Sequence, residues 1–144
     1  MMRVRTAMSG DAVEIASLIT LLGYPCSPDE ALERMHAVAD EPDQALLVAD
    51  RDGDLCGLLG LDLMYYLPLG ARTCRITALV VATAHRGEGV GRELLLAAEA
   101  WARHAGAARI EVTSAAHRNE AHAFYRACGY EDGAMRFVKR LGDA

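Results

Sequence analysis

The chain has 144 residues, of which 52% are hydrophobic, and its formal net charge at pH 7 is −5. This length and composition suffice for one domain with a sizeable core, so we expect a single domain over residues 1–144. The negative charge argues against a nucleic-acid binder and mildly favours small cationic molecules as partners.

The sequence lacks the features of secreted, membrane and zinc-binding proteins. The N-terminal Met-Met-Arg-Val-Arg is not followed by the apolar segment of a secretion signal. The longest apolar stretch, residues 55–71, is too short to span a membrane and is interrupted by Asp62 and Pro68. The four cysteines are far apart and form no Cys-x-x-Cys pair, which disfavours zinc ligation and indicates reduced thiols. We therefore expect a cytoplasmic protein without a metal and without a membrane partner.

The first third of the chain predicts a strand followed by two helices. Residues 4–8 alternate in polarity, which is typical of a short strand. Residues 11–14 have the spacing of a capping box and begin a helix that ends at Gly23. A second capping box at residues 27–30, with proline at the first helical position, begins the next helix.

Three strands are predicted next. Residues 44–50 and 55–66 are strand-like and are joined by Arg-Asp-Gly-Asp, a hairpin signal. A turn at residues 68–70 leads into a third strand-like run, residues 72–82. Because the connections are short, these strands should form an antiparallel meander.

The last part of the chain predicts two more helices and two more strands. Residues 90–105 form an amphipathic helix, and residues 109–113 form a strand. Asn119 can cap a short helix that ends at Gly129, and residues 135–141 form a last strand. A strand–helix–strand crossover within an otherwise antiparallel sheet predicts an α+β fold with a mixed sheet.

The most informative stretch is residues 86–91, Arg-Gly-Glu-Gly-Val-Gly, between a strand-like and a helix-like run. The alternating glycines let a ligand approach the backbone, and the following helix directs its free N–H groups into the same space. This arrangement predicts an anion site, most naturally for phosphate. A nucleotide P-loop needs a lysine after the last glycine, where this chain has Arg92, and a dinucleotide fingerprint needs a different glycine spacing.

Three segments in register resemble the acetyl-CoA-dependent N-acetyltransferases of the GNAT superfamily. The Arg-x-x-Gly-x-Gly stretch resembles their pyrophosphate loop, residues 76–81 resemble their fourth strand, and residues 119–130 resemble a later aromatic motif. The order of the predicted elements is also that of the GNAT fold. The resemblance implies a central mixed, mostly antiparallel sheet with splayed fourth and fifth strands, flanked by helices.

The resemblance also implies acetyl-CoA as the cosubstrate. In the family, pantetheine lies between the splayed strands like an added strand, where the backbone of Leu79 and Val81 would bind it. The glycine loop would hold the pyrophosphate, with added charge from Arg86 and Arg92. The residues implied in coenzyme binding are Leu79, Val80, Val81, Arg86, Gly87, Glu88, Gly89, Val90, Gly91, Arg92, Asn119 and Tyr125.

Tyr125 stands where the family often has a tyrosine near the coenzyme sulfur. Its phenol is a suitable proton donor to the departing thiolate, so Tyr125 is the predicted catalytic residue. Many relatives have a glutamate where this chain has Thr77, and threonine cannot accept a proton near neutral pH. The general base therefore stays unassigned among four candidates, Asp62, Glu111, His117 and His122.

The acceptor site is expected between the early helices and the long third strand. Tyrosine faces there suit an alkylammonium group, and a carboxylate would add charge. The predicted acceptor residues are Tyr24, Asp62, Tyr65 and Thr77. Some GNAT proteins with a segment like Leu-Gly-Tyr-Pro acetylate aminoglycosides, aminoalkylphosphonates or polyamines.

The sequence thus predicts an N-acetyltransferase that moves the acetyl group of acetyl-CoA to a primary amine of a small molecule by direct attack in a ternary complex. Two alternatives stay open: an acyl-CoA-binding sensor with little turnover, which the threonine at position 77 favours, and a protein or peptide N-acetyltransferase. A homodimer is expected only because two-fold dimers are the commonest assembly.

Overall fold

The computed structural model describes residues 1–113, 119–134 and 136–142. Residues 1–112 and residues 113–144 form two compact units, each of which is described by itself. The single domain over residues 1–144 therefore stays a prediction.

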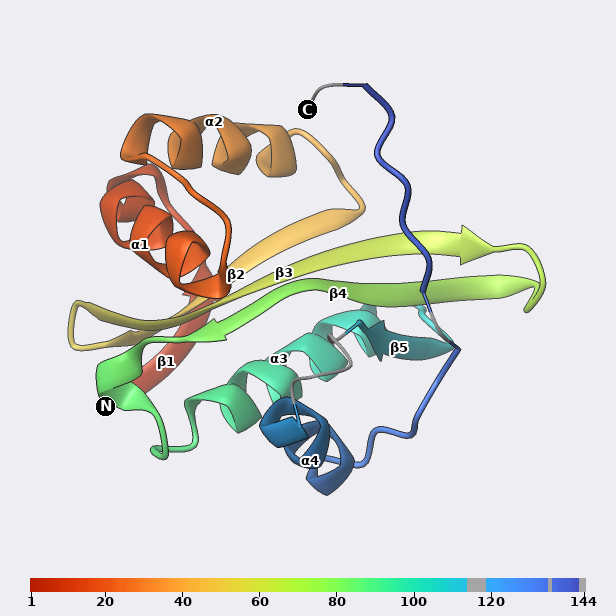
Figure 1. Ribbon diagram of the computed structural model, residues 1–144. Helices are drawn as coiled ribbons and strands as arrows, with labels where there is room; N and C mark the ends of the chain where they lie inside the picture. The colour runs from red at the N-terminus through yellow and green to blue at the C-terminus, as the bar shows by residue number, and fades with distance from the viewer. Residues whose placement is uncertain (114–118, 135, 143–144) are drawn as a thin grey trace. The chain divides into compact units, whose positions relative to one another are not determined.

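The first unit is built on a five-stranded sheet in the order β1-β2-β3-β4-β5 (Figure 1). Its strands are β1 (Met2–Thr6), β2 (Gln44–Arg51), β3 (Asp54–Tyr66), β4 (Ala71–Val81) and β5 (Arg109–Val112). The first four strands are antiparallel neighbours, and β5 is parallel to β4. The mixed, mostly antiparallel sheet and its central meander are confirmed.

Helices cover both faces of this sheet. Two helices, α1 (Ala12–Leu22) and α2 (Pro28–Ala39), lie over one face, and α3 (Val90–His104) lies over the other (Figure 1). Short 3₁₀ turns, η1 (Ser9–Asp11) and η2 (Thr83–His85), precede α1 and follow β4. No helix among the residues described is long and apolar enough to cross a bilayer.

The two predicted capping boxes differ in outcome. At α2 the box is confirmed, since the Glu30 N–H donates to the Ser27 hydroxyl (3.1 Å) and the Ser27 N–H donates to the Glu30 carboxylate (2.9 Å). At α1 it is wrong, because Asp11 makes no side-chain cap and Glu14 instead accepts the N–H of Leu55 (3.0 Å).

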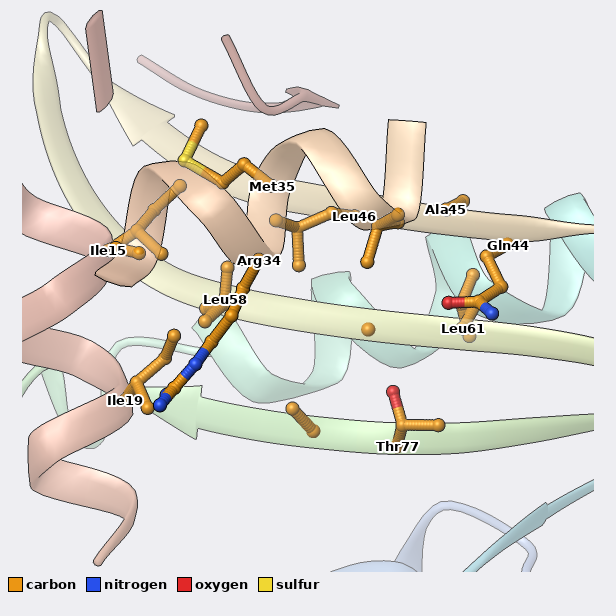
Figure 2. A pocket seen from close by; sticks show the side chains of 14 residues that line it. Ile15, Ile19, Arg34, Met35, Gln44, Ala45, Leu46, Leu58, Leu61 and Thr77 are labelled. Carbon is orange, nitrogen blue, oxygen red and sulfur yellow. The ribbon is translucent and has the colours of Figure 1, made fainter. Parts of the chain in front are cut away.

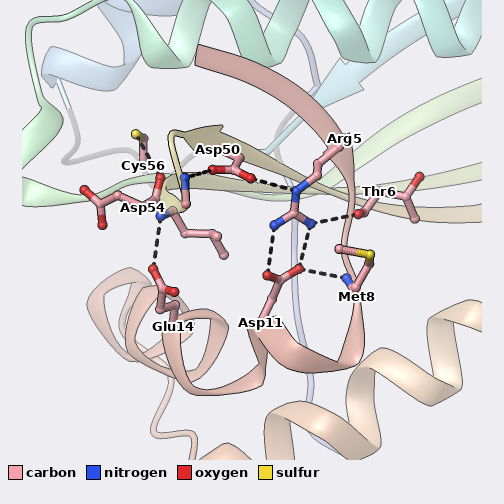
Figure 3. A network of polar contacts seen from close by, with 10 residues as sticks. Arg5, Thr6, Met8, Asp11, Glu14, Asp50, Asp54 and Cys56 are labelled. Carbon is pink, nitrogen blue, oxygen red and sulfur yellow. Dashed lines mark hydrogen bonds and ion pairs between the residues drawn. The ribbon is translucent and has the colours of Figure 1, made fainter. Parts of the chain in front are cut away.

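Asp11 is part of an ionic network that joins β1, α1 and the β2–β3 hairpin (Figure 3). The Arg5 guanidinium donates to both carboxylate oxygens of Asp11 (2.8 and 2.9 Å) and to Asp50 (3.0 Å). Asp50 in turn accepts the N–H of Gly53 (2.7 Å) in the hairpin turn. Hydrogen bonds from Arg5 lower the pKa of both carboxyl groups, so that these buried acids stay charged and paired.

Apolar side chains fill both sides of the sheet. On the side of α1 and α2 they include Ile15, Leu18, Val48 and Leu58. On the side of α3 the buried residues are Val90, Leu94, Leu95, Ala98 and Ala102. Glycine at position 57 lets α3 pack closely on the sheet, because an added Cβ would lie 2.9 Å from Leu94, 3.0 Å from the Val80 carbonyl oxygen and 3.1 Å from Val90.

The second unit contains α4 (Asn119–Ala127), which ends before Gly129 at φ +92°. Residues 136–142 form no strand, so the predicted last strand is wrong over that range, and Met135 lies outside the described residues. Strand-like composition does not form a strand without a paired neighbour, and the described residues give this segment none.

Candidate active site

A glycine loop joins η2 to the first turn of α3. Gly87 and Gly89 have φ values of +80° and +83°, a backbone conformation that favours glycine. A Cβ at either position would meet no atom within 4 Å, so the loop surface is open. Gly89 also caps α3 without a side chain, which leaves the first N–H groups of the helix uncapped by any side chain. The loop and the positive end of the helix dipole therefore suit an anion.

Two arginines flank this loop. Arg86 and Arg92 are both exposed, and neither forms an ion pair within the described parts of the chain. Their guanidinium groups are therefore available to phosphate oxygens, to which arginine binds in a bidentate manner.

Glu88, the third residue of the loop, is held by side chains from two elements. His85 Nδ1 lies 3.0 Å from Glu88 Oε1, and Arg51 of β2 contacts the same oxygen. His85 Nε2 lies 2.7 Å from Asp54 Oδ2 at the start of β3. We call these four residues the loop clasp, since they tie the glycine loop to the β2–β3 hairpin.

Of the four residues of the loop clasp, the sequence predicts a functional role only for Glu88, in coenzyme binding. Arg51, Asp54 and His85 were not predicted. Asp54 and His85 are 31 positions apart in the sequence. No local sequence pattern predicts a contact between side chains at that separation. The clasp is also electrostatically distinct: hydrogen bonds to Glu88 and Asp54 raise the pKa of His85, and the bond to His85 lowers the pKa of Glu88.

The end of β4 extends beyond its pairing with β5. The parallel pairing runs from Thr73↔Arg109 to Ile76↔Val112, and β4 then continues to Val81. The Ala82 N–H donates to the Cys56 carbonyl of β3 (2.7 Å). Since backbone groups alternate in direction along a strand, Leu79 and Val81 direct theirs away from β3, toward the edge that β5 leaves. This is the geometry that an added strand requires.

A bulge interrupts the pairing of β3 with β4 just before this edge. Gly60 pairs with Ala78 and Leu61 pairs with Ile76, which leaves Thr77 without a partner residue on β3. A Cβ at Gly60 would lie 2.5 Å from the Thr77 hydroxyl oxygen. Glycine at position 60 therefore makes room for this hydroxyl group.

The bulge opens into a cavity of about 150 Å³ between α1, α2 and strands β2–β4 (Figure 2). Its lining is mostly apolar, and the polar side chains among the lining residues belong to Arg34, Gln44 and Thr77. No carboxylate is found among the lining residues that the structure describes. The complete lining is Ile15, Ile19, Ala31, Arg34, Met35, Val38, Gln44, Ala45, Leu46, Leu58, Gly60, Leu61, Thr77 and Ala78.

Of the four residues predicted for the acceptor site, only Thr77 lines this cavity. Tyr24, in the α1–α2 connection, and Tyr65, near the end of β3, are largely exposed and lie outside the lining. Asp62 of β3 is also outside it. Arg34 and Gln44 were not predicted from the sequence, because Arg34 is an exposed residue of α2 beside the buried Met35 and has no distinguishing local pattern.

The predicted acid belongs to the second unit. Tyr125 is in α4, with its ring centroid 5.4 Å from that of Phe124 and 6.0 Å from that of Tyr130. Asn119 is the first residue of α4. The roles of both residues stay predictions.

The candidate bases are not equivalent in the structure. Glu111 accepts hydrogen bonds from Arg75 (2.8 Å) and Arg109 (3.4 Å), so its carboxylate oxygens already have partners. His117 lies outside the described residues. Asp62 and His122 stay candidates.

An anion-binding loop beside a strand edge is compatible with an acyltransferase of the coenzyme A type, and comparison with known proteins shows the family. The chain matches the acetyltransferase (GNAT) family over residues 13–130 and belongs to that family. The family, the fold class and the enzyme class predicted from the sequence, N-acetyltransferase, are confirmed.

The chain is similar in sequence to two N-acetyltransferases with named acceptors. The chain is 35% identical to the aminoalkylphosphonate N-acetyltransferase of Salmonella typhimurium over 101 residues, which are 70% of this chain and 66% of that protein. It is 32% identical to the aminoglycoside N(6')-acetyltransferase type 1 of Stenotrophomonas maltophilia over 132 residues, 90% of this chain and 86% of that protein. Among solved structures, the fold is shared with the aminoglycoside N-acetyltransferase AAC(6')-Iy in complex with CoA. The TM-score is 0.85 at 18% identity, over 98% of this chain and 95% of that one.

Proposed function

We propose that this protein transfers the acetyl group of acetyl-CoA to the primary amine of a small molecule, by direct attack in a ternary complex. The observation that carries the proposal is the sequence of features along β4. The cavity at Thr77 and Ala78 is followed by the free edge at Leu79 and Val81, and the glycine loop comes soon after. This order of features supports neighbouring sites for an acceptor, a thioester arm and a pyrophosphate.

The coenzyme is bound chiefly by backbone in this proposal. Leu79 and Val81 hydrogen-bond the pantetheine arm as a partner strand would. The N–H groups of the glycine loop and of the first turn of α3 bind the pyrophosphate, and Arg86 and Arg92 neutralise its charge. The loop clasp holds this loop in position through side-chain contacts, and three of its members, Arg51, Asp54 and His85, lie outside the loop.

The acceptor occupies the cavity beside the bulge. Its amine lone pair attacks the thioester carbonyl carbon, and the C–S bond breaks as the amide forms. Tyr125 donates a proton to the departing thiolate, because a phenol with an ordinary pKa near 10 is a competent donor at neutral pH. The acceptor ammonium loses one proton to solvent before the attack, because only the neutral amine has a lone pair, and its nitrogen loses a second proton as the amide forms. Thr77 can orient a water for these proton transfers.

The relatives support a small-molecule acceptor. Those two enzymes are named for an aminoalkylphosphonate and for aminoglycosides, which are small compounds bearing primary amines. The cavity is also smaller than the pockets of roughly 300 Å³ and above that hold drug-sized ligands.

The test is release of free coenzyme A from acetyl-CoA in the presence of a panel of amines. The panel holds aminoalkylphosphonates, amino acids, aminoglycosides, polyamines and a peptide with a free N-terminus. Turnover with small amines supports the proposal, whereas turnover with the peptide alone contradicts it in favour of a protein acetyltransferase. Tight acetyl-CoA binding without turnover on any amine contradicts it in favour of a sensor.

The variant Tyr125→Phe tests the acid, with Tyr130→Phe as the control in the same unit. General acid catalysis is worth about 100-fold or more, so kcat should fall by that factor in Tyr125→Phe at unchanged acetyl-CoA affinity. Equal rates in the two variants would remove Tyr125 from the mechanism while leaving the reaction intact.

A further inference from the structure

The cavity beside the bulge has an unusual charge for an amine-binding site. Amines are cations in solution, yet Arg34 supplies the only charge among the described lining residues. Carboxylates that would attract a polycation are not part of this lining. The local charge therefore opposes what the net charge of −5 suggested about the partner.

Arg34 is also available for a ligand. It extends from α2 past Leu58 toward Ile19, with its guanidinium group at one end of the cavity (Figure 2). It forms no hydrogen bond or ion pair within the described residues. Hydrogen bonds with Ser27 lower the pKa of Glu30, one helical turn earlier, and the nearby charge of Arg34 contributes less, so the carboxylate of Glu30 is bonded to Ser27 and not to Arg34. Arg34 thus keeps its donors for another partner.

We propose that Arg34 binds an anionic group of the acceptor, so that the substrate is a short zwitterionic amine bearing a phosphonate or a carboxylate. This inference rests on the proposed function, because it takes the cavity to be the acceptor site. A guanidinium binds either anion through two parallel hydrogen bonds. With the anion at Arg34, the alkyl chain lies along the apolar lining and the amine reaches toward Thr77 and Ala78.

The same arrangement disfavours polycationic acceptors. An aminoglycoside or a polyamine would bring further ammonium groups toward Arg34 and find no carboxylate in the described lining to offset them. Such repulsion between like charges is a means of rejecting the wrong partner. Arg34 is therefore a specificity-determining residue in this proposal.

The experiment compares acceptors of equal chain length. They are an aminoalkylphosphonate, the matching amino carboxylate and the matching alkylamine without an anion, with a linear polyamine as the polycation. For the wild type we expect kcat/KM to be higher for one or both anionic acceptors than for the other two. Comparing the phosphonate with the carboxylate identifies which anion is bound.

The variant Arg34→Gln should raise KM for the anionic acceptor about 10- to 100-fold, as expected for a lost charged hydrogen bond, with kcat little changed. It should leave the alkylamine unaffected, and Arg34→Lys should restore part of the loss. Arg103→Gln, an exposed position on α3, is the matched control and should change nothing. Equal effects of Arg34→Gln on all acceptors, or a wild-type preference for the polyamine, would overturn the inference.

Binding measured by calorimetry in the presence of CoA separates this inference from the proposed function. If no amine is acetylated but the anionic amine binds in an Arg34-dependent manner, the inference stands and the proposed function fails. If other amines are acetylated and the anionic amines neither bind nor react, the function stands and the inference fails. If none of the acceptors reacts or binds, both fail.

Discussion

His85 and Asp54 meet across 31 positions of sequence, with His85 Nε2 2.7 Å from Asp54 Oδ2. The other nitrogen of the same ring contacts Glu88 in the glycine loop at 3.0 Å. One imidazole therefore joins the loop to the β2–β3 hairpin, and the hairpin is itself anchored to β1 and α1 through Asp50 and Arg5. The proposed coenzyme loop is thereby connected to residues as distant as Arg5 and Asp50, which do not contact the loop themselves.

The loop clasp should make stability depend on pH. Hydrogen bonds to Glu88 and Asp54 raise the pKa of His85 above its ordinary 6.5. A group whose pKa is raised by folding adds stability that is fully present below its ordinary pKa and is lost as pH rises through the raised value. We therefore expect His85→Gln to lower the free energy of unfolding more at about pH 5.5 than at about pH 8.5.

Urea denaturation of both proteins at several pH values measures this difference. His104→Gln, an exposed histidine at the end of α3, is the control and should show no such trend. A difference between wild type and His85→Gln that is constant with pH would mean that the charged imidazole does not hold the clasp.

The glycine loop can be tested with two glycines of nearly equal backbone conformation. Gly89 in the loop has φ +83°, and Gly106 beyond the other end of α3 has φ +82°. Alanine at either position should cost roughly 1–2 kcal/mol of stability, the penalty of a left-handed L-residue. Only Gly89→Ala should also weaken acetyl-CoA binding, as measured by calorimetry. Equal coenzyme affinity in both variants would place the pyrophosphate elsewhere.

A side chain at position 60 should clash with Thr77 in the bulge, and a second substitution at Thr77 should relieve that clash. Gly60→Ala places a Cβ 2.5 Å from the Thr77 hydroxyl oxygen, so it should destabilise the protein by about 1–3 kcal/mol, as overpacking does. Adding Thr77→Ala removes that oxygen and should recover most of the loss in thermal denaturation. No recovery in the double variant would show that the strain comes from another contact.

The Arg5 network should fail at acidic pH. Hydrogen bonds from Arg5 hold the pKa values of Asp11 and Asp50 below the ordinary 3.8. A lowered pKa adds stability that is present above the ordinary value and is lost as pH falls through the lowered one. Arg5→Met should therefore be strongly destabilising near pH 7, and its difference from wild type should shrink below about pH 4.

The control is Arg126→Met in the second unit. The Arg126–Asp132 pair has side chains that are 57% and 75% exposed, and exposed pairs contribute little. If Arg5→Met and Arg126→Met lower the free energy of unfolding equally near neutral pH, burial does not make the Arg5 network more stabilising than an exposed ion pair.

Much of the fold could be predicted because its signals are local. The turn residues 51–54, the capping box at Ser27 and the alternating glycines each act within a few positions, and each element formed where expected. The capping box at Asp11 failed because Arg5 offers that carboxylate two charged hydrogen bonds and because Glu14 accepts the N–H of Leu55, 41 positions further along the chain. Local propensity yields where a tertiary contact is stronger.

The candidate site was less predictable for the same reason. Arg34 reaches the cavity only because α2 packs over the sheet, and the loop clasp forms only because a hairpin and a loop meet. Tyr24 and Tyr65 were chosen for their chemistry and lie outside the cavity lining, since residue type alone does not give direction. Thr77 lines the cavity because the bulge in the pairing of β3 with β4 leaves it without a partner residue on β3, and its role in acceptor binding stays a prediction.

Close packing around Gly57 limits which residues position 57 can accept. The first residue of α3, Val90, and the Val80 carbonyl would both lie within about 3 Å of a Cβ at that position. A methyl group there would lift the start of α3 from the sheet and move the adjoining loop with it. If that loop binds acetyl-CoA as proposed, a substitution in the protein interior would alter coenzyme affinity, and a random mutagenesis screen for altered acetyl-CoA affinity should recover it.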